Sequence, residues 1–90
     1  MDRDQLICIL KRLNELYEDR LLSENTKDLR RRKKAILEVD KRIADYAKSL
    51  PLELKELFDK QVGANSLNIQ HADDIGQCVD IVRELLRQMD

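Results

Sequence analysis

The chain has 90 residues, of which 42% are hydrophobic and 39% are charged, with a net charge of −1 at pH 7. A chain of this length forms one small domain, and its apolar content excludes an intrinsically disordered chain. It contains only two glycines and one proline, together with three aromatic residues. Few helix breakers combined with abundant Leu, Lys, Glu and Arg are typical of an all-α fold with an aliphatic core.

Neither a signal peptide nor a membrane span is predicted. The start of the chain is charged, and the longest uncharged stretch, residues 61–72, is polar in its middle and too short to cross a bilayer. Cys8 and Cys78 are expected to be reduced thiols of a cytoplasmic protein. The single histidine, His71, has no second ligand at a suitable spacing, so no metal and no other cofactor is predicted.

The first predicted helix runs from about residue 4 to residue 22. Asp2 or Asp4 is expected to cap it, because an aspartate side chain accepts hydrogen bonds from the free amides of a first turn. Arg20 stands where the next apolar residue of its buried face is due. The apolar residues recur in steps that place them on one face: Leu6, Ile9, Leu10, Leu13, Leu16 and Tyr17.

The second predicted helix runs from about residue 26 to residue 50. It follows a polar break, and Asn25 or Thr26 is expected to cap it. Steps of three and four alternate over three heptads, a pattern typical of a coiled-coil-like seam. The seam contains one charged residue and six apolar ones: Leu29, Arg32, Ile36, Val39, Ile43, Tyr46 and Leu50.

The short connection predicts that these two helices form an antiparallel hairpin. Val39 and Ile43 are then expected to be buried opposite Leu10 and Leu13.

The polar end of this hairpin has two possible explanations. Arg20 and Arg32 both lie close to the connection between the helices. Either nothing packs over the hairpin tip, or the tip binds an anionic group.

Two further helices are predicted, at about residues 51–62 and 69–89. Pro51 is expected to be the first residue of the short third helix, and Gly63 to follow its end. Asn68 is the expected cap of the fourth helix. Their apolar faces consist of Leu54, Leu57, Phe58 and Val62 in the third, and of Ile75, Cys78, Val79, Val82, Leu85, Leu86 and Met89 in the fourth. The predicted architecture is a small four-helix bundle in a single domain, residues 1–90.

Charge is unevenly distributed along the chain. Residues 24–50 contain nine basic and five acidic residues, whereas residues 51–90 contain four basic and eight acidic ones. The simplest expectation is that the acidic half lies near the basic helix within the chain.

Within residues 27–34, six side chains are basic, and we call them the basic cluster: Lys27, Arg30, Arg31, Arg32, Lys33 and Lys34. Successive residues of a helix point in different directions, so the cluster cannot pair with one neighbour. Arg31 and Lys34 are predicted to be exposed. Three interpretations stay open: a solvated face, a protein-docking patch and a nucleic-acid patch.

Several apolar residues lie off the predicted buried faces. Leu37 and Ile81 are expected to be buried by wide contacts in the bundle. Ile7 and Cys8, by contrast, are candidates for a dimer or partner face. Leu22 is a further candidate anchor for a partner.

No catalytic signature is present, so an enzyme is not predicted. The predicted function is a protein–protein interaction module, such as an adaptor, a chaperone-like protein or an inhibitor, that acts by helix-face docking. Self-association is also open. The alternatives are a nucleic-acid-associated protein using residues 27–34 and a structural subunit of a homo-oligomer; a membrane partner is not expected. The predicted partner-binding residues are Ile7, Arg20, Lys27, Arg30, Arg31, Arg32 and Lys34.

Overall fold

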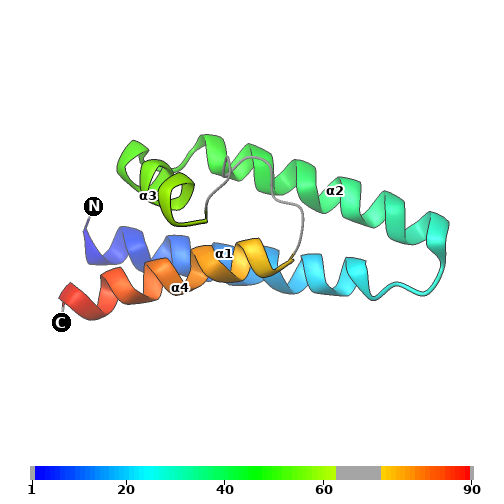
Figure 1. Ribbon diagram of the computed structural model, residues 1–90, viewed down its shortest axis with the longest axis horizontal. Coiled ribbons are helices and arrows are strands. Elements are labelled where there is room, and N and C mark those ends of the chain that lie inside the picture. The colour runs from blue at the N-terminus through cyan, green and yellow to red at the C-terminus, as the bar shows by residue number, and fades with distance from the viewer. Residues whose placement is uncertain (1, 63–71, 90) are drawn as a thin grey trace.

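The computed structural model describes residues 2–62 and 72–89, with side chains at residues 2–61 and 74–89. This part of the chain is all-α, without a strand, and the predicted bundle of four helices is confirmed. Both α2 and α4 run antiparallel to α1, and α2 and α3 form a layer above α1 and α4 (Figure 1). The helices are α1 (Arg3–Glu24), α2 (Leu29–Lys48), α3 (Leu52–Val62) and α4 (Ala72–Met89).

The start of α1 follows from its cap. Asp2 precedes the helix, and its carboxylate accepts a hydrogen bond from the Gln5 amide at 2.7 Å, which satisfies one of the free amides of the first turn. The other end lies two residues beyond the predicted one, at Glu24. There the Asn25 amide donates to the Leu21 carbonyl oxygen at 3.1 Å.

The predicted caps of α2 are wrong. Asn25 ends α1 instead, and the Thr26 hydroxyl donates back to the Leu22 carbonyl oxygen at 3.1 Å. Asp28 is the cap, because its carboxylate accepts from the Arg30 amide at 2.9 Å. A carboxylate at this position also interacts favourably with the positive end of the helix dipole. As a result α2 begins three residues later than predicted.

The boundaries of α3 and α4 also differ slightly from the prediction. Pro51 lies just before α3 and is not its first residue, and its carbonyl oxygen accepts from the Leu54 and Lys55 amides, both at 3.1 Å. The described part of α4 begins at Ala72. The predicted end of the third helix at Gly63 and the predicted cap Asn68 lie outside the described residues.

The core is aliphatic, as expected, and all four helices contribute to it. Leu54 and Phe58 of α3 are almost completely buried, and burying a side chain of this size contributes about 1.5–3 kcal/mol. They lie in the larger part of the core, with Leu6, Ile9, Leu13, Ala47, Leu50, Cys78, Val79 and Val82. A smaller part consists of Leu16, Val39, Ile43 and Ile75.

Close packing between α1 and α4 depends on Gly76. A Cβ atom at this position would lie 3.2 Å from the Tyr17 ring, which is closer than ordinary van der Waals contact. The absence of a side chain at Gly76 therefore lets the Tyr17 ring pack directly against α4. This contact is a structural reason for a glycine inside a helix, where its conformational freedom is otherwise unfavourable.

The pairing of α1 with α2 differs from the prediction. Val39 and Ile43 are buried, as predicted, but they pack with Leu16 and not with Leu10 and Leu13. The offset amounts to more than one helical turn, and it carries the beginning of α2 past the end of α1 (Figure 1).

Two ion pairs across the helices follow the same offset. Arg20 contacts Asp40, and Arg42 contacts Asp19, with nitrogen–oxygen distances of 2.8 and 3.3 Å. Both pairs join positions that the predicted pairing would have held apart.

Candidate protein-docking site

The α1–α2 hairpin extends beyond the beginning of α4 at one end of the molecule (Figure 1). We call this part, residues 21–38, the projecting tip. In α2 it includes Leu29 to Glu38, ten residues among which none is buried. A helix of ten residues is about 15 Å long, so a substantial length of α2 lacks the packing that covers Val39 and Ile43.

Three leucines of the projecting tip are exposed. The exposed fraction is 70% for Leu22, 57% for Leu29 and 70% for Leu37, so the expected burial of Leu37 is wrong. Leu29, Lys33 and Leu37 are four residues apart and share one flank of α2. Exposed leucines in one region favour a surface that a partner covers.

The basic cluster surrounds the beginning of α2. Arg31 and Lys34 are exposed, as predicted, and so are Lys27, Arg30 and Lys33. The nearest carboxylate to Arg31 is that of Asp28, at 4.0 Å, a solvated contact of little energy. Among the described residues, no carboxylate lies within ion-pair distance of the other four exposed members.

Arg32 differs from the rest of the cluster. It occupies the seam position of α2 and is half-buried, and its Nε atom is buried without a hydrogen-bond partner among the described residues. The offset of the helices explains this position, because the seam here lies beyond the last apolar residue of α1.

Arg20 is buried, with an exposed fraction of 4%. The explanation that nothing packs over the hairpin tip therefore does not hold for Arg20, although it agrees with residues 29–38 of α2, none of which is buried. Its guanidinium contacts Asp40 at 2.8 Å and Glu24 at 3.3 Å, so carboxylates of the chain itself surround it. These internal partners give Arg20 a structural role in joining α1 to α2, and they separate it from the exposed cations.

Two opposing effects act on the pKa of the Asp40 carboxyl. Burial raises its pKa above the ordinary value, and this outweighs the lowering by the nearby Arg20 guanidinium. The carboxyl side chain is 35% exposed, so water still reaches it. The pair is thus a partly solvated contact at the base of the projecting tip.

Ile7 lies apart from the other predicted site residues. It is half-buried in the first turns of α1, at the end of the molecule that holds both termini (Figure 1). Cys8 next to it is exposed, as its position off the helix face predicted. The structure brings together the basic cluster and the leucines of the tip, but not Ile7.

The sequence did not identify the leucines of the tip as a group. The apolar pattern places Leu29 in the seam and Leu37 in the core, and the predicted partner-binding residues do not include Lys33. The periodic pattern shows which face of α2 is apolar, but it does not show how far α2 slides along α1. The offset decides which residues are covered.

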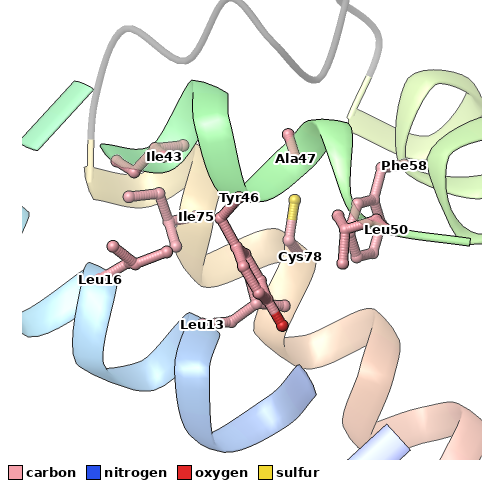
Figure 2. A pocket seen from close by; sticks show the side chains of 9 residues that line it. All are labelled: Leu13, Leu16, Ile43, Tyr46, Ala47, Leu50, Phe58, Ile75 and Cys78. Atoms are coloured by element: carbon pink, nitrogen blue, oxygen red, sulfur yellow. The ribbon is translucent and has the colours of Figure 1, made fainter. Parts of the chain in front are cut away.

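The apolar cavity inside the bundle does not form a second site. It has a volume of 20 Å³, about enough for one water molecule, and Figure 2 shows its lining from all four helices. The Cys78 thiol points toward α2 there. Burial raises its pKa to about 12, helped by the Asp74 and Asp59 carboxylates, so it stays protonated and poorly nucleophilic at neutral pH.

Metal binding and membrane insertion find no support in the described residues. No group of three or more His, Cys, Asp and Glu side chains there could hold a metal ion. No described helix has the length and apolar character needed to cross a bilayer. Comparisons with protein-family models, with curated proteins and with solved structures find no significant match to this chain.

Proposed function

We propose that this chain is a non-enzymatic protein-interaction module that docks an acidic partner protein on its projecting tip. The observation that carries the proposal is the combination of exposed leucines and uncompensated cations on a part of α2 that the fold leaves uncovered. Burial of the leucines would supply affinity. The basic cluster would orient the partner and raise the association rate.

A protein partner fits the tip better than nucleic acid does. Residues 21–38 contain no aromatic side chain that could stack on a base, whereas Leu22, Leu29 and Leu37 offer apolar surface that a phosphate backbone would leave uncovered. An adaptor, a chaperone-like protein and an inhibitor all use such a surface. The two unpaired cysteines support the cytoplasm as the proposed compartment.

The test compares wild type with an Arg31→Glu/Lys34→Glu variant in binding to a protein that co-purifies with the tagged chain. The free energy of unfolding should change by no more than about 0.5 kcal/mol, because both side chains are exposed. Association should slow markedly. A matched control, Lys11→Glu/Arg83→Glu, makes the same charge change at exposed positions of α1 and α4 and should bind like wild type.

A second variant tests the apolar part of the site. Leu29→Ser/Leu37→Ser removes two exposed anchors and should speed dissociation while the fold stays intact. Binding at two salt concentrations then separates the partner classes, because counterion release makes nucleic-acid binding fall steeply with salt. Unchanged binding by both tip variants would refute the proposed function.

A further inference from the structure

Among the described residues, the acidic half of the chain does not neutralise the basic cluster, contrary to the expectation from sequence. The described part of the molecule measures 44 × 21 × 19 Å, and α3 lies at the end of the long axis opposite the projecting tip (Figure 1). The ion pairs that α2 makes with another helix, through Asp40 and Arg42, go to α1. The carboxylates of α3 therefore lie at the opposite end of the molecule from the basic cluster (Figure 1).

The surface of α3 complements the tip in its exposed apolar residue and in its charge. Leu52 is 69% exposed, and the neighbouring Glu53 and Glu56 are exposed carboxylates with no ion-pair partner among the described residues. α3 thus presents an uncovered leucine beside two exposed carboxylates, and with Lys55 and Lys60 its net charge is −1. The projecting tip presents uncovered leucines beside free positive charge.

We propose that a second copy of this chain occupies the projecting tip, in an antiparallel pair in which each tip lies on the partner's α3. This inference rests on the proposed function, because it names an acidic protein surface that the tip would bind. The tip and α3 belong to the same layer of the molecule (Figure 1), so one two-fold axis forms both contacts at once. Such an isologous arrangement closes as a dimer.

Other arrangements of two copies are less favourable. Tip against tip would bring two basic clusters together, and like charges at close range oppose association. An antiparallel pair instead places the basic cluster of each copy against the exposed carboxylates of α3 in the other copy. The long face, 44 Å by 21 Å, has room for the roughly 800 Å² per partner that a stable interface needs.

Sedimentation of the purified full chain over a range of concentrations and at two salt concentrations tests the proposal. Wild type should form a dimer that weakens as salt rises. Reversing the tip charges (Arg30→Glu/Lys34→Glu) or the α3 charges (Glu53→Lys/Glu56→Lys) should each weaken dimerisation by at least about tenfold, since attraction becomes repulsion at both contacts.

The two reversals should compensate each other. An equimolar mixture of the two variants should form a heterodimer, and a chain that carries all four substitutions should dimerise again. Lys11→Glu/Arg83→Glu, at exposed positions of α1 and α4 in the other layer, matches the charge change of the tip reversal and should remain dimeric. Circular dichroism of each variant should match that of wild type, which shows that loss of the dimer is not loss of the fold.

Two outcomes would overturn the second-copy proposal. One is a wild-type chain that stays monomeric at every concentration; the other is a dimer that both charge reversals leave unchanged. If the chain is monomeric but a tip reversal still abolishes binding to a different acidic protein, the proposed function stands and only the second copy fails. A monomer whose tip binds nucleic acid, with a steep salt dependence, would overturn both.

Discussion

Cys78 lies in the larger part of the core, among Ala47, Leu50 and Phe58. Its protonation is therefore coupled to folding. The folded chain holds the thiol proton up to a pKa of about 12, whereas the ordinary thiol pKa is 9.0. Between these values the unfolded chain binds fewer protons than the folded one, so stability is complete below pH 9 and declines as pH rises toward 12.

This coupling predicts a loss of stability at alkaline pH that is due to one residue, Cys78. At pH 10 the wild type should have lost about 1.4 kcal/mol through Cys78 relative to pH 8. Urea unfolding at the two pH values measures it, and Cys78→Ala should lack this part of the loss. Cys8→Ala removes an exposed thiol and should keep it. An identical loss in Cys78→Ala and wild type would contradict the burial of this thiol.

The ion pair between Arg20 and Asp40 makes a second prediction at this scale. Asp40→Ala removes the closest partner of a buried guanidinium, which should cost about 1–3 kcal/mol after allowance for the water that reaches the carboxyl. Asp45→Ala, at an exposed position of the same helix, should change stability by less than about 0.5 kcal/mol. Thermal unfolding of the two variants compares them directly, and equal effects would refute the observed pairing of α1 with α2.

The elements themselves could be predicted from local patterns, because the spacing of apolar residues identifies each helix and its buried face. The caps were harder to predict. Asn25, Thr26 and Asp28 all favour a helix start, and only the geometry of the connection assigns Asp28 to α2. The boundaries therefore shifted by up to three residues, while the type of each element was right.

The axial position of α2 could not be predicted in this way. A heptad pattern repeats, so several offsets bury the same face equally well. The choice among them depends on long-range contacts such as that of Arg20 with Asp40. The sequence contains both charged residues but does not show that they pair with each other. The same ambiguity affects the candidate site: its basic residues and Leu22 could be identified from the sequence, but Leu29 and Leu37 could not.

The two halves of α2 predict opposite responses to the same kind of substitution. Ile43→Ala empties a buried position and should cost about 2–4 kcal/mol, as core truncations do. Leu37→Ala, at an exposed position six residues earlier, should cost less than about 0.5 kcal/mol. Chemical denaturation of both variants provides the measurement, and a large loss in Leu37→Ala would mean that the projecting tip is packed.

At the scale of the whole molecule, charge and packing are segregated along the same axis. The end that holds both termini and α3 contains the larger part of the core, whereas the projecting tip contains the basic cluster and little buried apolar surface (Figure 1). A net charge of −1 conceals this polarity. Residues 21–38 contain six basic and three acidic residues, so the excess of positive charge lies at one end of the molecule.

The uncovered beginning of α2 also determines how the backbone opens. Short helical segments are marginal in water without tertiary packing, so the amides of residues 33–37 should exchange with deuterium at least about tenfold faster than those of residues 43–47, through local unfolding. Exchange measured by mass spectrometry or NMR would show this gradient, and uniform protection along α2 would contradict it. A partner that docks on the tip would then stabilise the helical form of this segment. Part of the binding free energy goes into ordering it, and slower exchange there should report occupancy without any knowledge of the partner.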